Sequence, residues 1–185
     1  VGIGHTRWAT HGEVNEVNSH PHHSGDIVIV HNGIIENYLE IKDFLIRKGY
    51  TFYGNTDTEI ACAYIDYEYK NNKKKDMIKI LNKCSKKFIG SYAIVVMVKS
   101  ISDKLFVMKK DSPLIIANGS GENYIASDVS AFANSANSYI ILDDLEVGIV
   151  EENNIHIYKD SKEKELTFIN IDKDVMDNDL GNYSH

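Results

Sequence analysis

The sequence predicts an α+β protein in which β-sheets are covered by helices. Residues 27–30 are four consecutive apolar β-branched residues, which favour a buried strand. Three stretches with apolar residues at helical spacing follow before residue 88. From Gly90 onward apolar and polar residues alternate in many short segments that look like antiparallel strands. Helices and strands are thus grouped rather than strictly alternating, which disfavours a doubly wound parallel fold.

In the N-terminal part, residues 1–8 are predicted to form a short strand that leads into a polar, histidine-rich loop. The strand at 27–30 is expected to be buried on both faces. The first helix should end at Gly49, because glycine commonly follows a helix C-terminus. Its apolar positions are Ile34, Ile35, Tyr38, Ile41, Leu45 and Ile46.

Residues 51–53 are predicted to form a short strand. Thr56 lies three positions before Glu59, as in a capping box, so a second helix should run from Asp57 to about residue 70. A third helix is expected from about residue 76 to 87.

The pattern from Gly90 onward predicts strands joined by turns, with residues 118–121 and 153–154 as turn sequences. Residues 128–134 suit one short helix. Beyond Thr167 the composition turns polar. We therefore expect one domain over residues 1–170 and a linker over residues 171–185 toward a further domain. The strand candidates are 92–98, 104–108, 114–117, 124–127, 139–142, 147–151 and 155–158.

The composition excludes several classes of protein. Hydrophobic residues make up 43% and charged residues 25% of the 185, as in a globular domain. The net charge is −7 and the 20 Lys and Arg are scattered apart from residues 73–75, so no nucleic-acid partner is expected. No apolar run nears the roughly 18 residues of a membrane helix, and the first residues do not resemble a signal peptide. Two cysteines favour a reducing, cytoplasmic location.

The densest group of polar donors lies in residues 5–12. Arg7 can hold a carboxylate through two parallel N–H bonds, while Trp8, Thr10 and His11 add an indole, a hydroxyl and an imidazole beside it. The alternative is a loop with a packed Trp and a surface Arg.

Two further positions suggest a binding site. The Asn32 amide and the Gly33 N–H can point two donors at one oxygen, which suits a tetrahedral oxyanion, although Asn-Gly is also a common turn. Asp57 either caps its helix or faces a cationic group such as an α-amine.

The other reactive side chains are expected to be structural. Residues 20–23 contain three histidines, but they match no metal-binding signature, so neither a metal nor another cofactor is expected. Cys62 and Cys84 lie beside apolar residues on helix faces and are interpreted as buried thiols.

Together these segments resemble one family, the glutaminase (class II glutamine amidotransferase) domains of glutamine-fructose-6-phosphate aminotransferases, also called glucosamine-6-phosphate synthases. The likeness covers essentially the whole chain. The segments that carry it, in this order, are residues 5–12, 18–22, 30–37, 55–59, 112–114, 121–128 and 183–185.

The resemblance implies the N-terminal nucleophile hydrolase fold, a four-layer αββα sandwich, here without its N-terminal portion. In that family an N-terminal Cys attacks the glutamine side-chain amide, assisted by its own α-amine. Ammonia then passes to a sugar isomerase domain that aminates fructose 6-phosphate in amino-sugar synthesis. Partners implied are L-glutamine, that isomerase domain and a second copy in a homodimer.

The resemblance also implies roles for individual residues. Arg7 would hold the glutamine α-carboxylate in a pocket shaped by Trp8, Thr10 and His11. Asp57 would hold the α-amino group. His20 would lie near the pocket, and Asn32 and Gly33 would form the oxyanion hole.

The chain has neither an initiating Met nor an N-terminal Cys, so we expect it to begin inside a longer protein and to be inactive alone. Two alternatives stay open. One is a glutamine-binding sensor module without catalysis, and the other is the glutaminase domain of a different class II amidotransferase.

Overall fold

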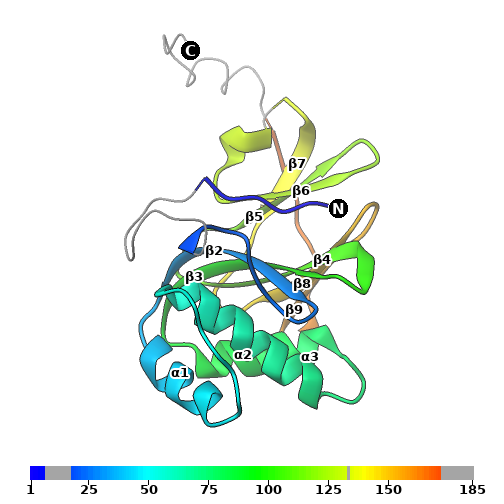
Figure 1. Ribbon diagram of the computed structural model, residues 1–185. Helices are drawn as coiled ribbons and strands as arrows, with labels where there is room; N and C mark the ends of the chain where they lie inside the picture. Colours follow the sequence, from blue (N-terminus) through cyan, green and yellow to red (C-terminus); the bar gives the residue numbers. More distant parts are fainter. Residues whose placement is uncertain (7–17, 133, 172–185) are drawn as a thin grey trace, which may run out of the picture.

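The computed structural model describes residues 1–6, 18–132 and 134–171. These form two stacked antiparallel sheets, with three α-helices covering the outer face of the larger sheet (Figure 1). The larger sheet has the strand order β1-β2-β3-β4-β8-β9-β10, and the smaller has the order β11-β7-β5-β6. The α+β class predicted from the sequence is confirmed.

The strands of the larger sheet are β1 (His22–Ser24), β2 (Ile27–Ile35), β3 (Gly90–Val98), β4 (Ile101–Lys110), β8 (Val147–Glu151), β9 (Ile155–Lys159) and β10 (Lys162–Glu163). Those of the smaller sheet are β5 (Ile115–Gly119), β6 (Asn123–Ala126), β7 (Ala136–Ile141) and β11 (Ile169–Asn170). The predicted strands from residue 92 onward are therefore all present. β1, β10 and β11 were not predicted, because segments of two or three residues are too short to show a period.

The helices are α1 (Tyr38–Ile46), α2 (Asp57–Asn71) and α3 (Met77–Lys87). The predicted N-cap is confirmed, since Thr56 Oγ1 accepts from the Glu59 N–H at 3.1 Å. Asp76 caps α3 in the same way, accepting from the Lys79 N–H at 3.2 Å. The short helix predicted at 128–134 is the 3₁₀ turn η2 (Val129–Phe132).

Strand β2 separates two cores. Ile27, Ile29 and Ile35 are fully buried and pack against the helices. Val30 points the other way, into the apolar layer between the two sheets. Because side chains alternate along a strand, β2 supplies both layers, and the prediction of a strand buried on both faces is confirmed.

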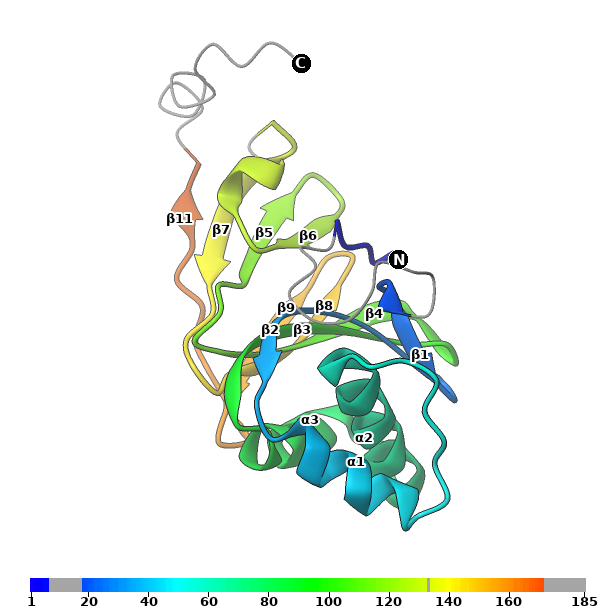
Figure 2. The same cartoon turned by 60° about the vertical axis from the view of Figure 1, so that its left-hand side comes forward.

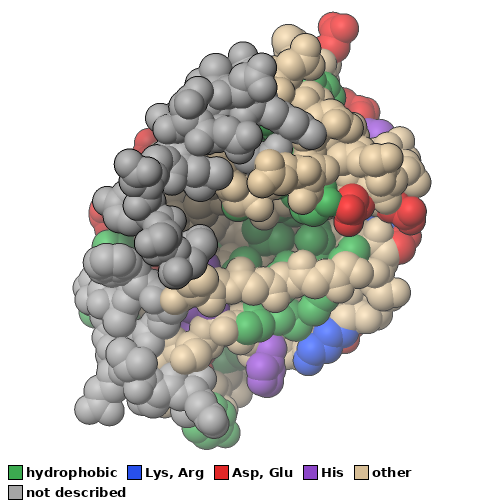
Figure 3. Space-filling model, turned by 90° about the horizontal axis from the view of Figure 1, so that it is seen from above, with side chains coloured by type: hydrophobic (Ala, Val, Ile, Leu, Met, Phe, Trp, Pro, Cys, Tyr) green, Lys and Arg blue, Asp and Glu red, His purple; other side chains and the backbone are tan. Residues whose placement is uncertain are grey.

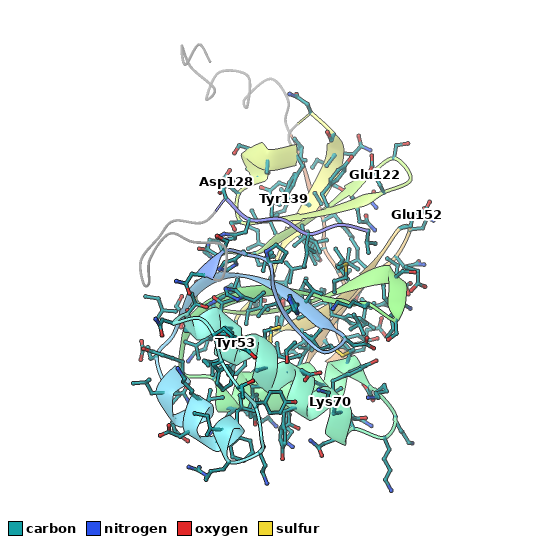
Figure 4. The ribbon with its side chains drawn as sticks, in the orientation of Figure 1. Tyr53, Lys70, Glu122, Asp128, Tyr139 and Glu152 are labelled. Carbon is teal, nitrogen blue, oxygen red and sulfur yellow. The ribbon has the colours of Figure 1, made fainter. Side chains whose placement is uncertain are left out.

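The two sheets are joined at one end by a side chain of β6. Asn123 Nδ2 donates to the carbonyl of Glu151, at the end of β8, at 2.7 Å. Figure 4 labels Glu122, the residue before β6, and Glu152, the residue after β8, at this end of the sheets.

Three sequence predictions were wrong. Residues 1–6 form no strand; they run as extended chain between the two sheets (Figure 2). Ile34 and Ile35 belong to β2 rather than to a helix, because residues 32–35 pair with residues 90–93 of β3 and this pairing overrides helical spacing. Residues 51–53 form no strand either; the Tyr53 and Gly54 N–H groups bind the Glu59 carboxylate instead.

No helix in the described ranges is both long and apolar enough to cross a membrane.

The cap of α3 gives a test of the helical layer. Replacing Asp76 with Ala leaves the Lys79 N–H without its acceptor, so the free energy of unfolding should fall by about 1 kcal/mol. Urea unfolding followed by circular dichroism measures the change. Asp76→Ser, which retains a side-chain acceptor, should lose less than half as much, and equal losses for both variants would contradict the capping role.

Candidate functional site

A cavity of about 480 Å³ opens between the two sheets, within the size range of small-molecule sites. Figure 3 shows the opening from above as a hollow with hydrophobic side chains inside it. One wall comes from β2 and β3, another from β6 and the turn after it, and residues 4–6 cross the cavity. The lining residues are Gly4, His5, Thr6, Val30, His31, Asn32, Ala93, Val95, Leu114, Ile125, Ala126, Ser127 and Ala131.

Asn32 brings an amide to this cavity. It follows Val30 on the inter-sheet side of β2 and lies opposite Ala93 of β3. Its neighbours on the wall are mostly apolar, so its amide is one of few hydrogen-bonding groups that this wall offers a ligand. Asn32 is exposed, so a ligand that enters the cavity can reach its amide, which can donate to a developing negative charge.

Gly33 is required by the closeness of β3. Its φ is +128°, and a Cβ there would overlap the Ser91 carbonyl oxygen and lie 2.9 Å from Ser112 Oγ. The dipeptide Asn32-Gly33 is therefore an interior segment of β2, and the alternative that it forms a turn is wrong. Ser112 also hydrogen-bonds Ser91, with their Oγ atoms 2.7 Å apart. It lies in the 112–114 segment that resembles the family, but no role was predicted for it.

Asp57 connects α2 to β2. Its Oδ2 accepts from the Ile35 N–H at 2.7 Å, and its Oδ1 accepts from the Thr58 N–H at 2.9 Å. Its side chain keeps 17% of its surface exposed, so the carboxylate can accept further bonds. Thr56, not Asp57, is the N-cap of α2, although the Asp57 carboxylate also lies at this positive end of the helix.

His20 joins separate parts of the chain at this site. Its Nδ1 accepts from the His31 N–H at 3.2 Å, and its ring stacks on that of His5 with centroids 4.4 Å apart. The adjacent His22 bonds Thr56 Oγ1 through Nε2 at 3.1 Å. His20 Nε2 also lies 3.5 Å from Thr58 Oγ1. The loop before β1 and β1 itself therefore contact residues 1–6, β2 and the start of α2.

His31 is buried between β2 and α2. Its Nδ1 lies 3.0 Å from Thr58 Oγ1 and 3.9 Å from Asp57 Oδ2. Burial lowers the pKa of His31 from 6.5 to about 4, and the nearby Asp57 carboxylate only partly opposes this shift. The imidazole is thus neutral at physiological pH.

Both cysteines are fully buried within the helical core, as predicted. The Cys62 Sγ faces the carbonyl oxygens of His22 and Ile27 at 3.5 and 3.7 Å. Burial raises the pKa of the Cys62 thiol and that of the Cys84 thiol. A buried thiol that resists ionisation is a poor nucleophile.

Of the residues singled out from the sequence, His20, Asn32, Gly33 and Asp57 are described and lie around the second half of β2 and the start of α2. Arg7, Trp8, Thr10 and His11 lie outside the described residues. Thr58 and Ser127 were missed. Ser127 lies in the 121–128 segment that resembles the family, and that likeness could have indicated it. For Thr58 the only indication in the sequence is its position next to Asp57 at the helix start. No group of three or more His, Cys, Asp or Glu side chains in the described ranges is arranged to hold a metal ion.

Comparison with known proteins agrees with this geometry. A family model described as a glutamine amidotransferase domain matches residues 5–134, which is most of the chain. The chain belongs to the glutamine amidotransferase domain family. The match includes Asn32, Gly33 and Asp57 together with the segment around Arg7.

Two curated relatives of this amidotransferase domain are named glutamine–fructose-6-phosphate aminotransferase (isomerizing). The protein from Caldanaerobacter subterraneus is 45% identical over 157 residues, covering 84% of this chain and 25% of its own length. That from Clostridium tetani is 40% identical over 188 residues, covering 100% and 30% respectively. The chain thus spans less than a third of the length of these relatives.

Solved structures share the fold of the domain. A structure titled as the allosteric regulatory enzyme of purine biosynthesis superposes with a TM-score of 0.69 at 22% identity. The glutamine phosphoribosylpyrophosphate amidotransferase from B. subtilis, complexed with ADP and GMP, gives 0.67 at 20% identity. Each covers 84% of this chain and 34% of the solved chain, and this likeness confirms the predicted sandwich architecture.

The buried His31 predicts how stability depends on pH. Between pH 6.5 and about 4 the unfolded chain binds a proton at this position that the folded chain does not. The free energy of unfolding should therefore fall as the pH falls through this window, by on the order of 3 kcal/mol from this group. Urea unfolding at several pH values measures the slope. His31→Asn should flatten it, whereas the exposed His23→Asn should not, and an unchanged slope in His31→Asn would contradict the assignment.

Proposed function

We propose that this glutamine amidotransferase domain binds L-glutamine in the inter-sheet cavity and serves to release ammonia from its side-chain amide. The observation that carries the proposal is Asn32. A central strand brings its amide to a largely apolar cavity, and Thr6 lines the same cavity. Membership of the family supports the same ligand.

Recognition of the amino acid uses opposite charges for the two ends of its zwitterion. The Arg7 guanidinium would hold the α-carboxylate through paired N–H bonds, in a pocket completed by Trp8, Thr10 and His11. The Asp57 carboxylate would accept from the α-ammonium, with His20 nearby. Asp57 has the exposed surface for this, although it also binds two backbone N–H groups.

The chemistry that this site supports is nucleophilic acyl transfer. A thiolate adds to the side-chain amide carbon, and the carbonyl oxygen becomes an oxyanion that accepts from Asn32 Nδ2 and the Gly33 N–H. The α-amine of the nucleophilic cysteine first takes the proton from the thiol. When the carbon–nitrogen bond breaks, this proton passes to the nitrogen, which leaves as ammonia. Water hydrolyses the resulting thioester to glutamate.

Neither cysteine of the chain suits this step, because Cys62 and Cys84 are fully buried with raised thiol pKa values. We assign the nucleophile to the N-terminal cysteine that the family resemblance implies. Within these 185 residues the domain would then bind glutamine without hydrolysing it.

The names of the relatives support a setting for the released ammonia. We propose that residues 1–170 form the glutaminase domain of a cytoplasmic glutamine–fructose-6-phosphate aminotransferase and that residues 171–185 lead to its sugar isomerase domain. That domain would aminate fructose 6-phosphate in amino-sugar synthesis, within a homodimer. No cofactor is needed for the glutaminase step.

Glutamine binding has a matched arginine control. L-Glutamine should raise the melting temperature of the chain, and Arg7→Ala should weaken binding at least about tenfold by removing the carboxylate contacts. Arg47, the exposed C-cap of α1, is the other arginine, so Arg47→Ala should bind normally. Differential scanning fluorimetry and calorimetry measure both, and equal behaviour of the two variants would argue against the assignment.

Hydrolysis gives a separate prediction. The 185-residue chain should release no ammonia from L-glutamine, because its two thiols are buried. A coupled glutamate dehydrogenase assay measures the product. Activity that disappears in Cys62→Ser or Cys84→Ser would overturn this account of the nucleophile.

A further inference from the structure

The Thr58 hydroxyl links an imidazole to a carboxylate at the start of α2. Its Oγ1 lies 3.0 Å from His31 Nδ1, 3.5 Å from Asp57 Oδ1 and 3.5 Å from His20 Nε2. His31 itself is 3.9 Å from Asp57 Oδ2, too far for a direct hydrogen bond. Thr58 therefore bridges the strand that carries Asn32 and the carboxylate proposed to receive the α-amine.

Proton accounting gives each group one role. The Asp57 carboxylate is an acceptor, so the Thr58 hydroxyl proton is directed to it. With that proton on the Asp57 side, Thr58 Oγ1 can accept from His31 Nδ1 at 3.0 Å and from His20 Nε2 at 3.5 Å, since His20 Nδ1 already accepts from the His31 N–H. This arrangement places the imidazole proton of His31 on Nδ1. His31 Nε2 is left as a buried acceptor, and among the described residues it has no partner. A buried ring nitrogen without a partner destabilises the fold, so the position of this ring calls for an explanation outside packing.

The charge of the imidazole matters to the neighbouring carboxylate. The titratable groups near His31 are Asp57 on α2, His5 in the N-terminal segment, His22 on β1, and His20 in the loop before β1, whose Nδ1 accepts from the His31 N–H. A protonated imidazole would form an ion pair with Asp57 and compete with an incoming α-ammonium. Burial keeps the ring neutral, so the ring can orient the carboxylate through Thr58 without neutralising its charge.

We propose that His31 is a positioning residue for the amino acid ligand, and that it holds the Asp57 carboxylate through Thr58 so that Asp57 receives the α-ammonium group. This inference rests on the proposed function, because it takes Asp57 as the α-amine acceptor. It assigns to the residue before Asn32 a role in recognition rather than in the chemical step.

The test compares L-glutamine with 4-carbamoylbutanoate, which has the same amide and carboxylate but no α-amine. His31→Ala should weaken glutamine binding by about tenfold while changing binding of the analogue by less than about twofold. His31→Asn, whose amide can donate from near the position of Nδ1, should restore most of the glutamine affinity. His23→Ala, on the exposed side of β1, is the matched control and should bind both ligands normally.

Thr58 offers an independent pair of variants. Thr58→Val removes the hydroxyl at nearly constant shape and should reproduce the selective loss, whereas Thr58→Ser keeps the hydroxyl and should bind like the wild type. If the two residues act as one unit, the double variant His31→Ala/Thr58→Val should lose no more than either single variant.

The outcomes distinguish the positioning role of His31 from glutamine binding itself. Equal losses for both ligands, or no loss in His31→Ala and Thr58→Val, would overturn the positioning role while leaving glutamine binding intact. A wild-type chain that binds neither ligand would contradict the proposed function and the inference together. Melting temperatures of the unliganded variants show whether each is folded at the temperature of the binding experiment.

Discussion

The pairing of β2 with β3 is the constraint on which the site depends. The two central strands are in continuous antiparallel register from Ile27 opposite Val98 to Ile35 opposite Gly90. Alternation along β2 then sends Ile29 and Ile35 into the helical core and Asn32 into the cavity. A shift of one residue would exchange these faces, burying the amide among helices and exposing isoleucines. The same apolar contacts that stabilise the sheet therefore determine where the Asn32 amide lies.

The start of α2 makes a second connection to this strand. Asp57 accepts from the Ile35 N–H, and Thr58 bonds the His31 imidazole, so two consecutive residues of the helix bind two residues of β2. The helix N-terminus favours a carboxylate there, which satisfies backbone donors and remains partly exposed. Asp57 thus binds backbone donors at the helix start, although Thr56 is the N-cap, and keeps exposed surface for the proposed α-amine contact.

Local pattern predicted most elements, because most of them satisfy one period along their own length. Helix α2 has its cap at Thr56, and helix α3 begins after Asp76 with apolar residues on one face. The failures lie where a partner outside the segment decides. Ile34 and Ile35 fit a helix by spacing but pair with β3, and residues 51–53 are extended but meet a glutamate side chain instead of a strand.

The sequence by itself determined which residues are candidates for the site and their order, from Arg7 through Asn32 and Gly33 to Asp57, and it identified both cysteines as buried. Side-chain chemistry is a property of each residue and can be recognised without coordinates. Only the tertiary structure placed Asn32-Gly33 inside a strand, made β3 the reason for the glycine and brought His31, Thr58 and Asp57 together. Those relations depend on contacts between segments more than twenty residues apart, and no local period encodes them.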